Sequence, residues 1–307
     1  MKESLLITKA SGLKEPLDLS KLSGTLERLG LAGQVAHEIS RAVAESLPSQ
    51  TTSDEILQRT LAELRRRDKK LAARYNLKRA IMDLGPTGFP FEHYVARILN
   101  AYGYETTVGQ RVPGYCVVHE VDVVAKKGNR HIIIECKYHN DRGSASDLHV
   151  AMYTHARFLD IQARWEDQEN SRRGQEAHFH EVWLVTNTRC TSDAIAYAQC
   201  HDVKILAWNF PPSSGADSGE ASPSRSSLER VIEYKNLYPI TVLPAVRPAL
   251  RDALFAKNLY LASDLSALSP KALSQSAGLP INVAQRVVGE ALALIAPNHK
   301  SQITNSK

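Results

Sequence analysis

Three charged side chains stand on two apolar segments that the sequence predicts to be neighbouring strands. Asp122 interrupts the first segment, residues 120–124, and Glu135 and Lys137 end the second, residues 132–137. Side chains alternate across a strand, so Glu135 and Lys137 share one face of it. Burying two carboxylates and an ammonium group is costly unless they pair with one another or hold a metal ion.

These groups suit the metal-assisted hydrolysis of a phosphodiester. Two carboxylates can hold Mg²⁺, a hard cation that prefers oxygen ligands, and a lysine can lie beside the attacking water. A lone Glu-x-Lys is more often an ordinary ion pair at a solvated sheet end. The aspartate on its own apolar strand and the pattern around it favour a nuclease site in this chain.

The composition is that of an ordinary globular protein, with 43% hydrophobic and 23% charged residues among 307, a length that predicts two or three domains. The sequence holds neither the roughly 18–20 consecutive apolar residues of a membrane span nor a secretory signal, so we expect a cytoplasmic protein without a membrane partner. Four cysteines without Cys-x-x-Cys spacing indicate reduced thiols rather than zinc. A net charge of +5 is compatible with a polyanionic partner.

Changes of pattern along the chain predict an α/β fold built from three blocks. Residues 1–85 combine a short strand with helices, and residues 86–210 alternate between helix and strand, as in a sheet covered on both faces. Residues 211–227 are rich in Pro, Gly and Ser, which predicts a linker or a long surface loop. Residues 228–297 are predicted to form a small helical domain, and residues 298–307 a disordered tail.

The central block carries four motifs in a fixed order: GFPFE at 88–92, YGY at 102–104, EVD at 120–122 and ECKYH at 135–139. This block resembles the core of the PD-(D/E)XK nucleases, and the Mrr-like restriction endonucleases are the nearest group. The resemblance covers about residues 86–210. It implies a restriction-endonuclease-like α/β sheet that cleaves DNA.

The same resemblance implies a role for each charged residue. Asp122 and Glu135 would hold Mg²⁺, and Lys137 would orient the attacking water or help to deprotonate it. Glu92, on the preceding helix, would tune the site directly or through a water molecule. Many relatives have a Gln in the helix after the Glu-x-Lys strand. This chain departs from them, and either Asp147 or His149 could take that place.

The first block carries a second set of motifs: LITKASG at 6–12, EPLD at 15–18, TSDEI at 52–56 and LAARY at 71–75. Residues 1–85 resemble an ATP-cone, the domain that regulates ribonucleotide reductases and a transcriptional repressor of their genes. The resemblance implies that ATP or dATP binds here and shifts a population between assembly states without being hydrolysed.

The residues that the ATP-cone resemblance assigns to the nucleotide fall into two groups. Lysines are point-charge binders of phosphate, whereas the acidic and hydroxyl side chains would contact ribose or base. Lys9 and Lys21 would contact the phosphates. The residues that would contact ribose or base are Glu15, Asp18 and Thr52. The family commonly has a basic residue at the position of Ala10, and its absence here implies a lower affinity, a different preferred nucleotide or a loss of binding.

Two further segments could contact nucleic acid. Residues 271–288 resemble a helix-hairpin-helix, in which backbone amides at a Gly turn contact a phosphate without reading the sequence. Lys271 and Arg286 could add charge there, although the same pattern also serves protein contacts. The basic run at 65–70 complements a helix C-terminus or contacts a DNA backbone.

Together these features predict a Mg²⁺-dependent DNA endonuclease that is regulated by ATP or dATP and acts as a homo-oligomer. Two alternatives stay open: a nucleotide-responsive DNA-binding regulator on an inactive nuclease fold, and an RNA-directed nuclease. Restriction, phage defence and repair are all compatible settings.

Overall fold

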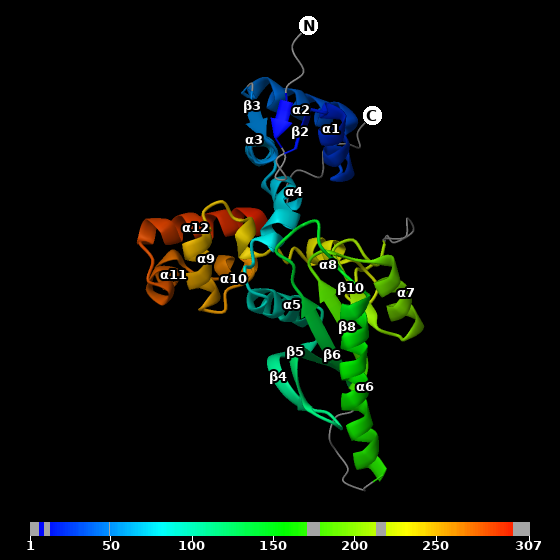
Figure 1. Ribbon diagram of the computed structural model, residues 1–307. Helices are drawn as coiled ribbons and strands as arrows, with labels where there is room; N and C mark the ends of the chain where they lie inside the picture. Colours follow the sequence, from blue (N-terminus) through cyan, green and yellow to red (C-terminus); the bar gives the residue numbers. More distant parts are fainter. Residues whose placement is uncertain (1–5, 9–12, 49, 171–178, 213–218, 297–307) are drawn as a thin grey trace. The chain divides into compact units, whose positions relative to one another are not determined.

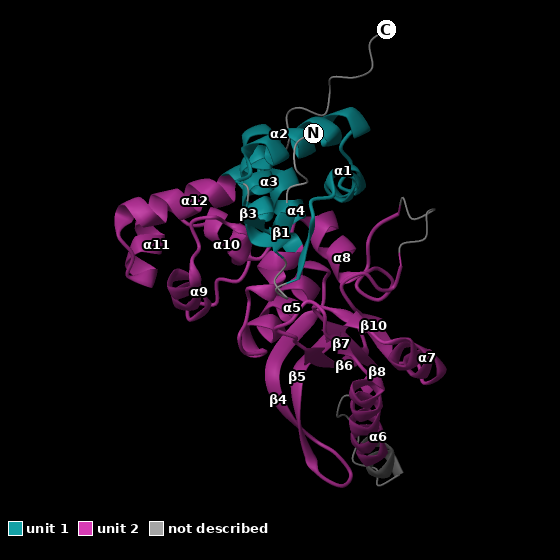
Figure 2. Cartoon of the chain, turned by 45° about the horizontal axis from the view of Figure 1, so that its top comes forward, with its two compact units in different colours: residues 1–77, 293–307 teal, residues 78–292 magenta. Residues whose placement is uncertain are grey.

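The structure is a computed structural model with a mixed α/β fold (Figure 1). It describes residues 6–8, 13–48, 50–170, 179–212 and 219–296. The chain divides into two compact units, residues 1–77 with 293–307 and residues 78–292 (Figure 2). Over the described segments, no helix combines the length and the apolar character needed to cross a bilayer.

The described residues up to 77 in the first unit form a three-stranded sheet and a set of helices, and the last of these helices, residues 69–82, continues into the second unit. β1 (Leu6–Thr8) is central, with β2 (Lys14–Pro16) antiparallel on one side and β3 (Gln50–Thr52) parallel on the other. The helices are α1 (Leu19–Arg28), α2 (Gly33–Ser46), α3 (Ser53–Arg67) and α4 (Lys69–Met82). Apolar residues recur at helical spacing and form one core, which includes Leu22, Leu26, Ile39, Val43, Leu61 and Leu64.

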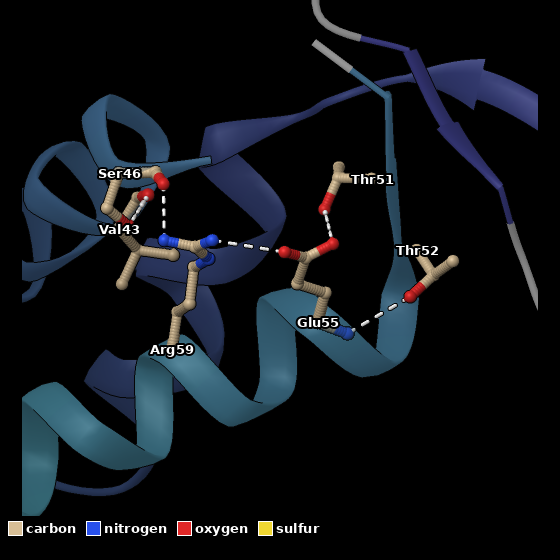
Figure 3. Close-up of polar contacts among 6 residues, drawn as sticks. All are labelled: Val43, Ser46, Thr51, Thr52, Glu55 and Arg59. Carbon is tan, nitrogen blue, oxygen red and sulfur yellow. Dashed lines mark hydrogen bonds and ion pairs between the residues drawn. The ribbon is translucent and has the colours of Figure 1, made fainter. Parts of the chain in front are cut away.

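A chain of polar contacts fixes the start of α3 (Figure 3). The hydroxyl of Thr52 accepts a hydrogen bond from the backbone N–H of Glu55 at 3.2 Å and so caps the helix. The Glu55 carboxylate accepts from the Thr51 hydroxyl at 3.1 Å and pairs with Arg59 at 3.0 Å. Arg59 also donates to the carbonyl of Ser46, so the same guanidinium ties the end of α2 to α3.

The second unit is built on a five-stranded sheet with the order β10-β8-β6-β5-β4. β4 (Glu105–Pro113), β5 (Val118–Lys127) and β6 (Arg130–Lys137) form an antiparallel meander. β8 (Phe179–Thr186) and β10 (Lys204–Leu206) extend the sheet in parallel with β6. Parallel neighbours need crossover connections, which α6 (Leu148–Asn170) and α7 (Ser192–Cys200) supply. Two short strands, β7 (Ala145–Ser146) and β9 (Arg189–Cys190), follow β6 and β8 in the chain and form a separate parallel pair.

Both faces of this sheet are covered, which explains the unbroken apolar run at 132–134. On one face, Ile133, Val182 and Leu184 pack in a single core with residues of α6 and α7. On the other face Trp183 is buried, and α5 (Phe89–Ala101) contacts the meander. α6 is the long green helix of Figure 1. In the chain it comes after β6 and the short strand β7.

Residues 228–292, which make up most of the predicted helical domain at 228–297, lie in the same compact unit as the sheet. The C-terminal helices are α8 (Leu228–Lys235), the 3₁₀ turn η1 (Ile240–Val242), α9 (Pro248–Phe255), α10 (Ala262–Ser266), α11 (Pro270–Ala277) and α12 (Ile281–Ile295). Two buried tyrosines, Tyr94 in α5 and Tyr102 directly after it, connect the sheet part of the unit to the C-terminal helices. The hydroxyl of Tyr94 donates to the carbonyl of Leu237 at 2.8 Å, and that of Tyr102 to the carbonyl of Val231 at 2.8 Å.

The stretch predicted as a linker or loop is described over 211–212 and 219–227. Residues 219–227 form turns without regular structure, and Ala221, Ser226 and Ser227 in it are buried. This part therefore packs within the second unit, to which it belongs. Residues 213–218 and the tail at 298–307 lie outside the described residues.

Candidate active site

The register of β5 and β6 brings Asp122 and Glu135 together. The antiparallel ladder ends at the pair Val123–Ile134, and Asp122 and Glu135 are the next residues of the two strands, close enough that the charge of Asp122 raises the pKa of Glu135. The backbone N–H of Cys136 donates to Oδ2 of Asp122 at 2.7 Å, which fixes this carboxylate at the strand end. The proximity that the sequence predicted for the two carboxylates is thus present.

Lys137 and Glu120 extend the charged group along the same face. Alternation places Lys137 on the face of Glu135, and Glu120 on the face of Asp122. Lys137 is exposed, and its charge helps to hold down the pKa values of both Asp122 and Glu135. The lysine is therefore close enough to act on the charge of the carboxylate pair.

Arg157 on α6 is a member of this site that the sequence analysis missed. It donates from Nη1 to Oε2 of Glu135, and the Arg157 and Glu135 side chains are only 10% and 17% exposed. Nη2 donates to the hydroxyl of Tyr153 at 2.9 Å, and the guanidinium lies 4.7 Å from the centre of that ring. No short motif marks this arginine, because its position depends on how α6 is rotated about its axis.

The residues suggested in place of the missing Gln lie at the start of α6 instead. Asp147 accepts from the backbone N–H of Val150 at 3.2 Å and pairs with His149, whose side chain is 93% exposed. Across the described segments, no hydrogen bond or ion pair links either residue to Asp122 or Glu135. Arg157, more than two helical turns further on, is the α6 residue that reaches the pair.

Glu92 belongs to the same electrostatic group, as the sequence predicted. It lies in the first turn of α5 and is partly buried. Burial, together with the negative charges of Asp122, Glu120 and Glu135, raises the pKa of Glu92 to about 7. A carboxyl group with this pKa can hold or release a proton near neutral pH.

The pKa values of the paired carboxylates are raised as well. Burial is the main cause for Asp122, and it is opposed by the Cys136 N–H and by Arg157. Burial and then the charge of Asp122 raise the pKa of Glu135, while Arg157 and Lys137 oppose the rise. These carboxylates destabilise each other when ionised, so a cation placed between them would be stabilising.

The donor set fits Mg²⁺. Among the described residues, no group of three or more His, Cys, Asp or Glu side chains forms a cage for a metal ion. Mg²⁺ does not need one, because it is bound through one or two carboxylates and keeps several waters. Two opposed carboxylates with raised pKa values match that requirement better than they match a structural zinc site.

The strands of the first unit place two of the predicted nucleotide ligands on either side of β1. Thr8 pairs with Lys14 on β2 and with Thr52 on β3, and Glu15 is the next residue of β2. The third candidate on this part of the chain, Lys9, lies outside the described residues. The geometry therefore groups Glu15 and Thr52 near one end of a small sheet.

The other two candidates lie at the start of α1. The Asp18 carboxylate caps this helix by accepting from the backbone N–H of Ser20 at 3.0 Å, and its pKa is lowered mainly by the hydrogen bond that the Ser20 hydroxyl donates to it. Lys21 lies 3.8 Å from that carboxylate and its side chain is 72% exposed. Asp18 and Thr52 thus each have a capping role that does not depend on a nucleotide, whereas Lys21 is open to a ligand.

The predicted hairpin at 271–288 contains two helices joined by a tight turn. Gly278 ends α11 with a φ of +65°, a conformation that glycine adopts without strain, and α12 begins at Ile281. Lys271 is exposed, and Arg286 pairs with Glu290 at 3.2 Å.

Comparison with known proteins finds relatives for about two thirds of the chain. No protein-family model matches it. An uncharacterized protein of Archaeoglobus fulgidus is 34% identical over 202 residues, which cover 66% of this chain and 99% of that protein. The crystal structure of the protein of unknown function AF1548 matches with a TM-score of 0.54 and 32% identity, covering 67% of this chain and 96% of the other.

Proposed function

This chain belongs to the family of the Archaeoglobus fulgidus protein, and we propose that it is a Mg²⁺-dependent endonuclease that hydrolyses phosphodiester bonds in DNA. One observation carries the proposal: Asp122 and Glu135 lie close together on neighbouring strands, where Asp122 accepts from the Cys136 N–H and its charge acts on Glu135, and Lys137 shares the strand face of Glu135. This arrangement supplies two oxygen ligands and one cation, as metal-assisted hydrolysis requires.

Each side chain has a distinct task in this proposal. Asp122 and Glu135 would hold Mg²⁺, which neutralises charge on the scissile phosphate and makes a bound water more acidic. Lys137 would orient the attacking water and offset the charge that develops on the phosphate. Glu92, with a pKa of about 7, would exchange a proton near neutral pH.

The first unit would regulate this activity by binding ATP or dATP. Its support is the grouping of Glu15 and Thr52 on either side of β1 and the exposed ammonium of Lys21. A nucleotide that binds one assembly state better than another shifts the population between them. A homo-oligomer would also supply a second nuclease site for the opposite DNA strand.

Cleavage of supercoiled plasmid in Mg²⁺, with and without ATP or dATP, tests the proposal. Glu135→Gln and Lys137→Ala are each expected to slow cleavage by at least roughly 100-fold, the usual cost of losing a group that stabilises the transition state. The matched control is Glu105→Gln, which neutralises an exposed carboxylate at the start of β4. This variant should cut at the wild-type rate. Cleavage that survives in both site variants would contradict the assignment.

Two further arms address regulation and the choice of nucleic acid. A matched RNA substrate that is cut faster than DNA would favour an RNA-directed nuclease. Lys21→Gln is expected to weaken ATP or dATP binding in equilibrium dialysis and to remove any effect of nucleotide on cleavage. An effect of nucleotide that is unchanged in this variant would count against the assignment of Lys21.

A DNA-binding regulator without cleavage is the second candidate, and the Arg157–Glu135 pair favours it. This ion pair satisfies the carboxylate without a metal ion. Under that alternative, wild type shifts DNA in a gel yet leaves plasmids of several methylation states intact, and Glu135→Gln binds DNA as well as wild type.

A further inference from the structure

A polar pocket of about 370 Å³ opens on the sheet face opposite to the candidate active site. Its floor contains Ile132 and Trp183, whereas the adjacent Ile133 and Val182 belong to the core under α6. Neighbouring residues of a strand point to opposite faces, so this pocket and the Asp122–Glu135 pair lie on different sides of the sheet. The remaining lining residues are Tyr104, Lys127, Arg130, Glu181, Lys204, Ser224 and Arg225.

The pocket carries four cationic side chains and one carboxylate. Glu181, which is 11% exposed, accepts from Nε1 of Trp183 at 3.0 Å and pairs with Arg130. This carboxylate is therefore already satisfied by two donors from the sheet. Only one of the four cations is neutralised by it directly.

None of the other three cations forms an ion pair with a carboxylate of the described residues. Lys127 is held in place, because its Nζ donates to the carbonyl of Tyr102 at 2.9 Å and lies 4.7 Å from the centre of the Tyr104 ring. Lys204 and Arg225 form no ion pair with any described residue. Cations that converge on one hollow repel each other, so a bound anion would lower the electrostatic energy of the pocket.

We propose that this pocket binds a small anion with two or more phosphoryl groups, such as pyrophosphate, inorganic triphosphate or the phosphate chain of a nucleotide. Its volume falls within the roughly 300–1,000 Å³ typical of sites for small ligands. Lysine offers point charges and arginine a planar fork, and both bind phosphoryl oxygens. Cations that come from β5, β6, β10 and the 219–227 segment can contact several phosphoryl groups at once.

Calorimetric titration of the full chain with pyrophosphate and with inorganic triphosphate, in EDTA, tests the proposal. The double variant Lys204→Gln/Arg225→Gln is expected to bind at least about 100-fold more weakly, since a hydrogen bond to a charged group contributes about tenfold or more. Both side chains are exposed, so the fold should tolerate the change, and Lys204→Gln alone serves as a milder version. The matched control, Lys126→Gln, removes an exposed lysine of β5 that does not line the pocket and should bind as wild type.

The outcomes separate the pocket from other anion sites. Binding that is lost in the double variant and kept in the control supports the pocket. A wild type that binds neither probe, or an equal loss in Lys126→Gln, overturns the proposal. A parallel ATP titration, made in the Lys21→Gln background so that the proposed first-unit site is weakened, identifies the source of the phosphates: loss of the remaining ATP binding in the double variant means a nucleotide, and unchanged ATP binding means free polyphosphate. DNA binding that falls in the double variant, while neither probe binds wild type, would assign these cations to nucleic acid instead.

Discussion

Arg157 donates a hydrogen bond from Nη1 to Oε2 of Glu135, and this contact joins α6 to the end of β6. The guanidinium is held from its other side by the hydroxyl of Tyr153, one turn earlier in the helix. Its charge lowers the pKa values of Glu135 and Asp122, against the effect of burial. Arg157 therefore partly offsets the negative charge of these carboxylates, as a bound metal ion would.

Replacing Arg157 with Met is expected to tighten divalent-cation binding and to lower stability when no cation is present. The substitution leaves the enclosed Glu135 carboxylate without its partner, a change that typically costs about 3–5 kcal/mol in buried pairs. It also removes a positive charge that repels Mg²⁺. Thermal melts in EDTA measure the first effect, and titration with Mn²⁺ measures the second.

The double variant Arg157→Met/Glu135→Gln is the control for this prediction. A neutral amide in place of the carboxylate removes the unpaired charge, so stability should recover relative to Arg157→Met alone. Cation binding should not tighten, because one ligand is lost. Mn²⁺ affinity that stays at the wild-type value in Arg157→Met would show that the arginine does not compete with a metal ion.

The raised pKa of Glu92 predicts a pH-dependent stability. With a folded pKa of about 7 against an ordinary value of 4.5, the folded chain keeps a proton that the unfolded chain releases between these values. The resulting stabilisation is complete below the unfolded pKa and is lost as the pH rises through about 7. Glu92→Gln never carries the charge. It should therefore match wild type at about pH 5 and melt at a higher temperature than wild type at about pH 8.

Melts of both proteins in EDTA, over that pH range, test the assignment. Glu105→Gln is the matched control, because this exposed glutamate lies at the start of β4. The melting-temperature difference between Glu105→Gln and wild type should not change with pH. A Glu92→Gln difference that is equally constant would mean that the carboxyl group does not titrate near neutral pH.

The pairing of Asp122 with Glu135 was predictable because local rules fix it. Alternation assigns the faces, and a short connection leaves few registers between two apolar segments. In the structure Lys127 pairs with Arg130 across the two-residue turn at 128–129, and Gly128 adopts a φ of +59° there. The register that follows from this turn runs as far as the pair Val123–Ile134, directly before Glu135 and directly after Asp122 in sequence.

The contribution of Arg157 was not predictable, because it depends on the phase of a long helix. Each residue turns an α-helix by about 100°, so a shift of one position at the start of α6 would aim a different side chain at Glu135. The pocket on the opposite sheet face shows the same limit: Arg130 and Glu181 meet only because β6 and β8 pair in parallel. The packing of residues 228–292 against the sheet likewise depends on contacts between residues far apart in sequence. The hydroxyls of Tyr94 and Tyr102 donate to the carbonyls of Leu237 and Val231, respectively.

Gly114→Ala is expected to destabilise the turn between β4 and β5. A Cβ atom at this position would lie 2.0 Å from Oδ2 of Asp160 and 2.8 Å from the carbonyl oxygen of Val117. The Asp160 carboxylate accepts from the backbone N–H of Cys116 at 2.8 Å and pairs with His119 at 2.7 Å, so it cannot move without loss. Overpacking of this kind costs about 1–3 kcal/mol, which denaturant unfolding would measure.

Gly289→Ala is the matched control for the turn. Gly289 is exposed on α12, and no atom lies within 4 Å of the Cβ that alanine would add. Alanine favours a helix over glycine by up to about 1 kcal/mol, so this variant should be slightly more stable than wild type. If the two variants had equal free energies of unfolding, the contact between Gly114 and Asp160 would not be tight.

Thr52→Ala is expected to destabilise the first unit by about 1 kcal/mol, because the hydroxyl that caps α3 is lost and the N–H of Glu55 is left without its acceptor. Thr52→Ser keeps the oxygen and should remain close to wild type in denaturant unfolding. The same two variants separate capping from nucleotide contact. If the hydroxyl also contacts ATP or dATP, Thr52→Ala weakens nucleotide binding even under conditions where the first unit is fully folded, whereas Thr52→Ser preserves it. Nucleotide affinity that is equal in all three proteins would leave Thr52 with the capping role alone and would shift the proposed site towards Glu15 and Lys21.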